Sequence, residues 1–278
     1  MTPALLVLDL DGTALSVGRQ LAPVDVAAAR ALLRAGVRIT IATGRLYTGA
    51  AWVGRELGVR GTIAVMNGSE IVDIDTDEAR CGSYLTPDLL GLLRPVLIRR
   101  PVSTFVFASR TIHLGTADAD QRDYLGIWTE SLAEHPDIYE APLWETSPDV
   151  VALGIRAEDH AEVDDLTAAL RGAAPGDIVT EVFYTFDGAR FVKVRRSGVD
   201  KGTALCRLAA DRGLPVEATV AVGDWYNDVP MLEKAGASFA MGHASPDARQ
   251  AAHEVLTSTR HTGGAVAEVA RKVWGVEP

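Results

Sequence analysis

The sequence predicts an α/β protein in which a doubly wound parallel sheet is interrupted by an inserted α+β unit. Three observations support this fold class. Residues 1–82 alternate short apolar runs with helical patterns, residues 83–192 contain clustered short strands, and the alternation resumes after residue 198. Alternating strands and helices are typical of a parallel sheet, and clustered short strands of an antiparallel one. We therefore expect a core made of residues 1–82 and 193–278, with residues 83–192 inserted as a separate α+β domain.

The first part of the chain is expected to form a βαβαβ unit with right-handed crossovers. The run from Ala4 to Val7 is short, continuous and apolar, as in a strand buried on both faces. Pro23 opens a helical pattern and Gly36 follows its end, which is the usual placement of these residues. The expected elements are strand 4–10, helix 23–35, strand 37–42, helix 46–58 and strand 61–66.

The remaining elements follow from the same periodicities. In the inserted domain we expect helix 86–99, strands 103–108 and 111–115, helix 118–126, a loop over 135–148, strand 149–156, helix 158–171 and strands within 177–194. In the second part of the core we expect helix 200–212, strand 218–222, helix 227–235, strand 237–240, helix 245–252 and helix 263–273.

Composition excludes several classes of function. The chain has 278 residues and a formal net charge of −10, which argues against a broad nucleic-acid-binding surface. Cys81 and Cys206 are its only cysteines, and they fit a reducing compartment better than a disulfide framework. No apolar stretch reaches membrane-spanning length, and no signal peptide is expected. We therefore expect a cytoplasmic protein, a monomer or a small homo-oligomer.

Two carboxylates follow the first strand, in the segment Asp9-Leu10-Asp11-Gly12-Thr13. Ligands of open α/β sheets bind at the carboxyl ends of the strands. There, one aspartate can attack phosphorus, and the other can protonate a leaving group and then deprotonate water. Mg²⁺ would remove the repulsion between carboxylate and phosphate. The alternative is an ordinary turn with two solvated aspartates.

Two further segments carry phosphate-binding chemistry. The strand 37–42 ends in Thr43-Gly44-Arg45, where a hydroxyl, backbone N–H groups and a guanidinium can hold phosphate oxygens, although a plain turn is the alternative. Lys201 stands in the first turn of an expected helix, where it opposes the helix dipole. A place beside anionic ligands would compensate that cost; otherwise Lys201 is a solvated side chain.

The strand 218–222 ends in Gly223-Asp224 and continues to Asn227-Asp228. Asp224 is placed as a further metal ligand, Asn227 offers an amide to phosphate, and Asp228 is placed to orient Lys201. Together with the earlier strand ends, these residues predict one site at one edge of the sheet.

The motifs resemble those of the haloacid dehalogenase-like hydrolase superfamily, in particular its Cof-type sugar-phosphatase branch with a C2-type cap. The matching segments are Asp9-Leu10-Asp11-Gly12-Thr13, Thr43-Gly44-Arg45, Lys201, and Gly223-Asp224 with Asn227-Asp228. Asn67-Gly68 and Ala240-Met241-Gly242-His243-Ala244 also resemble features of the branch, with His243 where Asn is common. The resemblance covers the whole core and implies a Rossmann-like sheet, while the inserted domain matches only in position and coarse pattern.

The resemblance implies a role for each matching residue. Asp9 would be the nucleophile and a Mg²⁺ ligand, Asp11 the general acid/base that touches the metal through its carbonyl, and Asp224 the remaining ligand. The phosphate contacts would come from Thr43, Gly44, Lys201, Asn227 and the backbone of Leu10. Arg45 and Asp228 would support them. Trp225 is bulkier than the usual residue, which puts the preferred leaving group in doubt.

The spacing of the motifs fixes where a cap domain lies. Asp11 and Thr43 leave room for only one helix and one strand, so a cap must lie between Thr43 and Lys201. A closing cap would exclude water and supply substrate contacts. Possible leaving-group contacts in the cap, each otherwise a packing or surface residue, are Trp128, Trp144, Tyr139 and Arg190. The histidines show no zinc spacing and are expected to be solvated or packed: His113, His135, His160, His243, His253 and His261.

We therefore expect a Mg²⁺-dependent phosphatase that hydrolyses a small phosphorylated metabolite, such as a sugar phosphate, through an aspartyl-phosphate. Two alternatives remain: a phosphotransferase or phosphomutase on the same core, or a phosphate-ligand-binding protein without turnover. A dehalogenase fits less well, because Asp11 and the acidic fourth motif suit a metal and a phosphoryl group.

Overall fold

The computed structural model describes residues 3–185 and 188–278, which divide into two compact units. The core unit runs to Arg45 and contains Ala50–Cys81 and Val199–Pro278; the cap unit contains Leu46–Gly49 and Gly82–Gly198. Residues 193–198, expected in the core, belong to the cap unit because strand β11 (Arg190–Arg196) continues through most of them.

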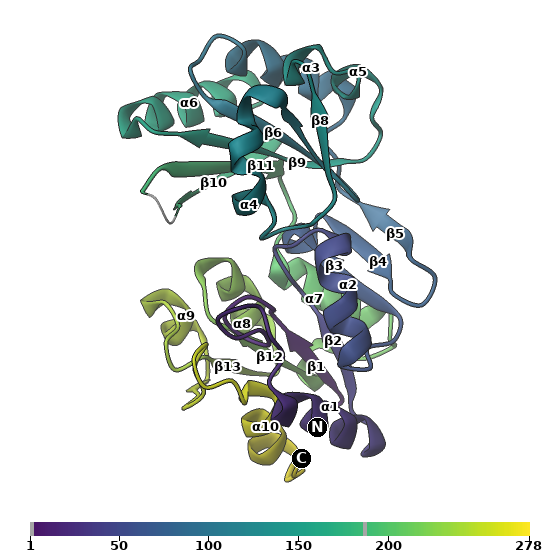
Figure 1. Cartoon of the computed structure of the whole chain (residues 1–278). Coiled ribbons are helices and arrows are strands. Elements are labelled where there is room, and N and C mark those ends of the chain that lie inside the picture. The colour runs from purple at the N-terminus through teal and green to yellow at the C-terminus, as the bar shows by residue number, and fades with distance from the viewer. Residues whose placement is uncertain (1–2, 186–187) are drawn as a thin grey trace. The chain divides into compact units, whose positions relative to one another are not determined.

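A parallel sheet forms the centre of the core unit (Figure 1). Its order is β14-β13-β12-β1-β2, and every neighbouring pair is parallel. The central strands are buried along their whole length, as expected for a sheet covered on both faces. The strands are β1 (Leu5–Leu8), β2 (Arg38–Ile41), β12 (Thr219–Gly223), β13 (Ala237–Ala240) and β14 (Glu254–Val255). The predicted fold class is confirmed.

Short helices connect and cover these strands. The first, α1, begins at Pro23 as the sequence predicts. The final helix, expected over 263–273, starts at Ala265 and continues as a π-helical turn, Ala270–Trp274. The helices with residues in the core unit are α1 (Pro23–Arg34), α2 (Tyr47–Glu56), α7 (Lys201–Ala210), α8 (Val229–Lys234), α9 (Pro246–Ala251) and α10 (Ala265–Val269), with 3₁₀ turns at Met66–Gly68, Val216–Ala218 and Tyr226–Asp228.

The core unit also contains a three-stranded sheet in the order β3-β4-β5, of which the sequence analysis predicted only the first strand. Strand β3 (Thr62–Val65) touches β2 through a parallel bridge between Ala42 and Ala64. The chain then turns back into β4 (Glu70–Asp73), antiparallel to β3, and β5 (Glu78–Gly82). Strand β5 is largely exposed and polar, so it lacks the apolar period that marks strands in a sequence.

The cap unit is a six-stranded sheet in the order β10-β11-β9-β6-β7-β8. All its pairs are antiparallel except β7 with β8. The region 135–148, expected to be a loop, instead contains the end of strand β8, a 3₁₀ turn (Ile138–Glu140) and the short helix α5 (Leu143–Thr146). The strands are β6 (Ser103–Ala108), β7 (Ile112–Gly115), β8 (Leu132–His135), β9 (Val150–Ala157), β10 (Ile178–Tyr184) and β11 (Arg190–Arg196).

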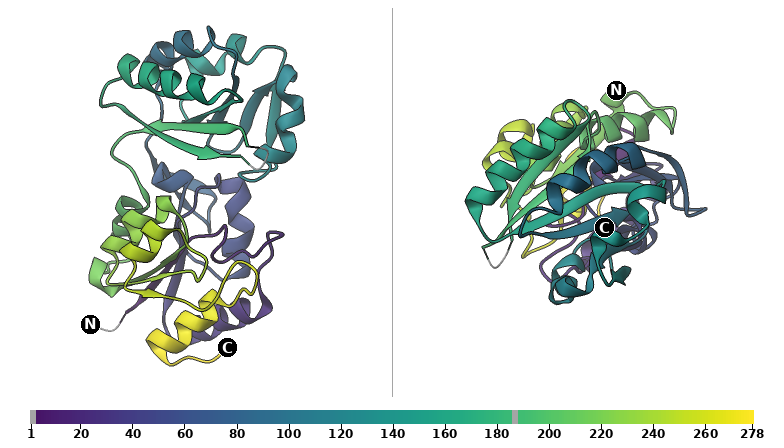
Figure 2. Two further views of the ribbon diagram at one scale, coloured as in Figure 1. Left: turned by 90° about the vertical axis from the view of Figure 1, so that its left-hand side faces the viewer. Right: turned by 90° about the horizontal axis from the view of Figure 1, so that it is seen from above.

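Helices α3 (Pro87–Leu97) and α6 (His160–Ala173) cover one face of the cap sheet (Figures 1 and 2). Their apolar side chains, such as Leu93 and Leu170, share one buried cluster with Val106, Leu153 and Val192 of the strands. The helices of the unit are α3 (Pro87–Leu97), α4 (Arg122–Leu125), α5 (Leu143–Thr146) and α6 (His160–Ala173), with 3₁₀ turns at Thr116–Gln121 and Ile138–Glu140. Within the described residues, no helix is both long and apolar enough to span a membrane.

Candidate active site

Adjacent parallel strands bring two of the predicted aspartates together. Leu8 of β1 pairs with Val222 of β12, and the N–H of Asp9 donates to the carbonyl of Val222 at 3.0 Å. Asp9 and Asp224 therefore follow neighbouring strands at the same edge of the sheet, because parallel strands end together. Both side chains are buried, at 5% exposure each.

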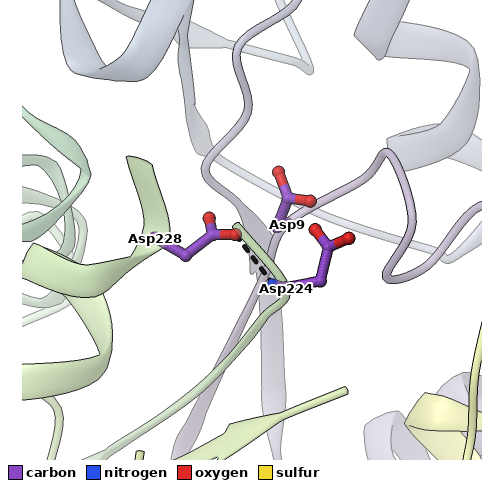
Figure 3. A group of neighbouring side chains, drawn as sticks. All are labelled: Asp9, Asp224 and Asp228. Atoms are coloured by element: carbon purple, nitrogen blue, oxygen red, sulfur yellow. Dashed lines mark hydrogen bonds between the residues drawn. The ribbon is translucent and has the colours of Figure 1, made fainter. Parts of the chain in front are cut away.

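Three carboxylates form one buried group at this edge. Asp9, Asp224 and Asp228 each offer an oxygen, and these oxygens lie within 4.8 Å of one another (Figure 3). Buried like charges at this separation repel each other unless a cation or protons neutralise them. The group is the one candidate cation site of this kind that the described part of the chain contains.

Burial and neighbouring negative charges both raise the pKa values of Asp9 and Asp224. Burial, followed by the charge of Asp228, raises the pKa of Asp9 to about 7, although Lys201 opposes the shift. Burial, followed by the charges of Asp9 and Asp228, raises the pKa of Asp224 to about 8. A bound divalent cation would favour the charged form of both carboxylates.

Lys201 supplies one positive charge inside the group. Its Nζ lies 2.5 Å from Oδ1 of Asp9 and 2.6 Å from Oδ1 of Asp228, and its side chain is fully buried. Burial alone would lower the pKa of Lys201, but the two carboxylates outweigh burial and raise it. Lys201 therefore lies between two anionic carboxylates. The cost of a lysine in the first turn of α7 is offset by these ion pairs and by a capping box between Asp200 and Thr203.

Asp228 differs from the other two carboxylates because hydrogen bonds engage both its oxygens. Oδ1 accepts from Lys201, and Oδ2 accepts from the backbone N–H groups of Asp224 and Trp225 at 2.8 and 2.9 Å. The side chain is completely buried. This carboxylate therefore fixes the turn after β12 and orients Lys201.

Gly12 lets the first motif approach Asp224. Its φ is +83°, and a Cβ atom built on it would lie 2.3 Å from Oδ2 of Asp224. Any other residue would meet the carboxylate and strain the backbone. The glycine of this motif is therefore needed for a close approach as well as for the turn.

Asp11 lies outside the three-carboxylate group. Its carboxylate pairs with the guanidinium of Arg45, through contacts of 2.8 Å from Nε and 2.5 Å from Nη2. The Asp11 side chain is 45% exposed, whereas Arg45 is 4% exposed. The sequence analysis expected Arg45 as a charged contact to phosphate; in the structure its described side-chain partner is Asp11.

The second motif and Asn227 are held by local hydrogen bonds. The backbone N–H of Arg45 donates to the Thr43 hydroxyl at 3.2 Å, and Thr43 is fully buried after β2. The amide of Asn227 donates to Oδ1 of Asn67 at 3.0 Å. Asn67 has a φ of 56° and is almost fully buried. The sequence analysis singled out Asn67 only for its resemblance to the branch; its contact with Asn227 was not foreseen.

His243 is a residue whose contact the sequence analysis missed. Expected to be solvated or packed, it places Nε2 3.1 Å from Oδ2 of Asp224. Burial and the nearby charges of Arg260, His261 and Arg249 lower the pKa of His243 to about 4, so the ring is neutral at pH 7. The available signal was its position just after the strand 237–240, next to the strand that carries Asp224.

The four cap residues named as possible leaving-group contacts all pack against, or hydrogen-bond to, other residues of the cap unit. Trp144 is 2% exposed, belongs to the apolar cluster under the helices, and donates its Nε1–H to the carbonyl of Ile138. Of the two alternatives for Trp144, substrate contact or packing, the structure therefore favours packing. Tyr139 hydrogen-bonds to Thr104 beside the same cluster. In the same unit, Trp128 packs among aromatic rings, and Arg190 pairs with Asp164.

Comparison with known proteins places this site in a family. The model of the haloacid dehalogenase-like hydrolase family matches residues 6–269. An HMP-PP phosphatase of Yersinia pseudotuberculosis is 28% identical over 255 residues, covering 88% of this chain and 86% of the relative. A haloacid dehalogenase-like hydrolase from Bacteroides thetaiotaomicron has a TM-score of 0.83 at 24% identity, covering 98% and 100% of the two chains. One from B. subtilis has a TM-score of 0.77 at 23% identity, covering 97% and 98%.

The family model spans nearly the whole chain, including every motif on which the sequence analysis depended. The two solved structures share the fold over almost their full length. The chain therefore belongs to the haloacid dehalogenase-like hydrolases, in the Cof-type branch that its motifs resemble, and is a phosphatase of that family.

Proposed function

We propose that this protein is a Mg²⁺-dependent phosphatase that hydrolyses small phosphomonoesters, such as sugar phosphates, through an aspartyl-phosphate on Asp9. One observation carries the proposal: buried carboxylates of Asp9 and Asp224 lie together at the carboxyl edge of a parallel sheet, beside a buried lysine. Such a group favours a hard cation and an anionic substrate.

The residues present fit Mg²⁺. Oxygen donors at short separation are what this ion prefers. Burial, with neighbouring carboxylate charges as a further cause, raises the pKa values of Asp9 and Asp224, and a cation would favour their charged forms. Asp9, Asp224 and the carbonyl of Asp11 would hold the ion. When bound, it would neutralise the phosphate oxygens and polarise phosphorus. Asp228 is less suited as a ligand because its oxygens are already engaged.

The first half of the reaction transfers the phosphoryl group to the protein. A carboxylate oxygen of Asp9 forms a bond to phosphorus while the bond from phosphorus to the ester oxygen breaks. Asp11 donates its proton to the leaving alkoxide, which departs as an alcohol. Lys201, Asn227, the Thr43 hydroxyl and the backbone at Leu10 and Gly44 hold the phosphoryl oxygens, and Asp228 keeps Lys201 in place.

The second half releases phosphate. Asp11, now a carboxylate, takes a proton from a water molecule, and the resulting hydroxide attacks phosphorus. The bond from phosphorus to Asp9 breaks, which restores the Asp9 carboxylate. The net reaction consumes one ester and one water and yields one alcohol and inorganic phosphate.

Sugar phosphates follow from the branch that the motifs resemble. The Yersinia relative is named for HMP-PP, so this compound belongs beside the sugar phosphates in any test.

The test is phosphate release from a panel of phosphorylated sugars, polyols, nucleotides and HMP-PP, with Mg²⁺ and with EDTA. We expect release from a few related compounds with Mg²⁺ and none with EDTA. Transfer of the phosphoryl group to a sugar hydroxyl in place of water would favour a phosphotransferase. Ligand binding without any turnover would favour a binding protein.

Acid quenching after mixing with ³²P-labelled substrate tests the intermediate. With ³²P-labelled p-nitrophenyl phosphate, whose leaving group needs no proton, the wild-type protein and Asp11→Asn should carry label, with more in Asp11→Asn because it lacks the base for the second step. Asp9→Asn should carry none and lose nearly all turnover. Label or full turnover in Asp9→Asn would refute the mechanism.

A further inference from the structure

His243 lies between Asp224 and a loop that follows β14, and both its ring nitrogens are engaged. The backbone N–H of Arg260 donates to Nδ1 at 3.1 Å. Nδ1 must therefore offer a lone pair, which puts the proton of the neutral ring on Nε2. Nε2–H then donates to Oδ2 of Asp224 at 3.1 Å.

The loop that orients the ring is itself fixed. The carboxylate of Glu268 accepts hydrogen bonds from the backbone N–H groups of Thr257 and Ser258, and from the Ser258 hydroxyl at 2.7 Å. Next to His243, in the turn after β13, the N–H of Gly242 donates to the carbonyl of Ser258 at 2.8 Å. The position of the His243 ring thus follows from buried structure on two sides.

Asp224 has a second anchor in its backbone. The N–H of Ser245 donates to the Asp224 carbonyl at 2.8 Å. Among the described residues, the side-chain contacts of Asp224 go to Oδ2: His243, and the guanidinium of Arg260 at 4.0 Å. No described hydrogen bond occupies Oδ1. A carboxylate with one oxygen held and the other open is suited to bind a cation through the open oxygen.

We infer that His243 is a positioning residue for metal binding: by donating Nε2–H to Oδ2 of Asp224, it holds that carboxylate in the orientation that binds the cation. The inference rests on the proposed function, since it takes Asp224 as a ligand of Mg²⁺. A histidine that served only packing would not need a defined tautomer or a hydrogen-bond partner fixed on each side.

Three substitutions separate the two hydrogen bonds of the ring. The substitution His243→Gln can place an amide N–H near the location of Nε2 and keep the donor to Asp224. The shorter side chain in His243→Asn can accept from the Arg260 N–H near the location of Nδ1, but does not reach Asp224. His243→Ala makes neither contact. His253, which hydrogen-bonds to the hydroxyl of Ser238, provides a matched control histidine in the same unit.

The experiment measures Mn²⁺ affinity by the electron paramagnetic resonance signal of the free ion, with no substrate present. We expect the dissociation constant to rise about 10- to 100-fold in His243→Ala and His243→Asn, because an outer hydrogen bond to a ligand typically contributes that much. His243→Gln should bind within a few-fold of wild type, and His253→Ala should equal it. In steady-state assays, the metal concentration for half activity should rise more than kcat falls at saturating metal.

Several outcomes would overturn the inference. Wild-type affinity in a folded His243→Ala protein would remove the role while leaving the proposed function intact. Equal losses in His243→Gln and His243→Ala would show that donation to Asp224 is not what matters. Absence of Mn²⁺ binding by the wild type, or unchanged binding in Asp224→Asn, would refute the proposed metal site itself and the inference with it.

Discussion

Arg45 holds both carboxylate oxygens of Asp11 through a two-point contact, with Nε 2.8 Å from Oδ2 and Nη2 2.5 Å from Oδ1. The arginine is buried and the aspartate is half exposed, so the arginine is the fixed partner and the carboxylate is the group that it orients. For a proposed general acid, orientation decides whether its proton reaches the leaving oxygen.

The substitution Arg45→Lys should therefore impair proton transfer. A lysine cannot reproduce the planar two-point contact, and we expect kcat for an alkyl phosphate to fall about tenfold or more, a part of the usual contribution of general acid catalysis. With p-nitrophenyl phosphate, whose leaving group needs no proton, the fall should be several times smaller. Asp11→Asn should show the same contrast more strongly. An equal fall with both substrates would contradict this role for Arg45.

Gly12 allows a direct test of the close approach to Asp224. Gly12→Ala should abolish activity and weaken divalent-cation binding, because the added Cβ would lie 2.3 Å from Oδ2 of Asp224. Gly18 is a matched control, with a φ of +87° and no atom within 4 Å of the place that a Cβ would take. Gly18→Ala should share the backbone strain, cost about 1 kcal/mol of stability and keep its metal affinity. The readouts are the unfolding free energy in urea and Mn²⁺ titration; similar metal affinities in the two variants would count against the prediction.

Removal of the buried lysine should cost stability as well as activity. Lys201→Met leaves Asp9 and Asp228 buried without their shared counter-ion, and breaking a buried pair in this way costs about 3–5 kcal/mol. The double variant Lys201→Met/Asp228→Asn removes one of the orphaned charges and should recover part of that loss. Denaturation by urea in metal-free buffer measures both values. A double variant less stable than Lys201→Met would show that charge is not the cause.

Metal binding should release protons around neutral pH. With pKa values of about 7 and about 8, Asp9 and Asp224 carry protons in the metal-free protein below these values. The cation must displace those protons, so its apparent affinity should rise with pH and level off above about pH 8. Calorimetry in buffers of different ionisation enthalpy should find about one to two protons released near pH 7 and almost none near pH 9.5. Asp224→Asn should release fewer; an affinity independent of pH would exclude this linkage.

The sequence allowed the core sheet and the positions of the polar residues at its strand ends to be predicted, because both follow from local patterns. A continuous apolar run marks each buried parallel strand, and the residue after the run faces the carboxyl edge of the sheet. For this reason the positions of Asp9, Thr43 and Asp224 after β1, β2 and β12 were foreseen before their contacts were known. The roles of these residues in catalysis stay a proposal.

What escaped prediction depends on tertiary contacts. Strand β5 is exposed and polar, so no periodicity reveals it. The partner of Arg45 was expected to be phosphate, because its sequence neighbours do not show that Asp11 lies within reach. His243 and Asn67 contact Asp224 and Asn227, which lie 19 and 160 positions away in the chain, and a lone polar residue carries no spacing by which to recognise it.

The insertion of the cap unit affects how the protein matures during synthesis. Asp9 and Lys201, in ion-pair contact, stand 192 positions apart in the chain, and β1 cannot pair with β12 until the whole intervening segment has been made. Most of the cap unit is one uninterrupted stretch, Gly82–Gly198, that leaves the ribosome before the second part of the core and can form its own apolar cluster. A growing chain that ends before Lys201 thus holds Asp9 without its cationic partner and without Asp224. The complete group of carboxylates and lysine can therefore form only late in synthesis, after the segment that carries Lys201, Asp224 and Asp228 has been made.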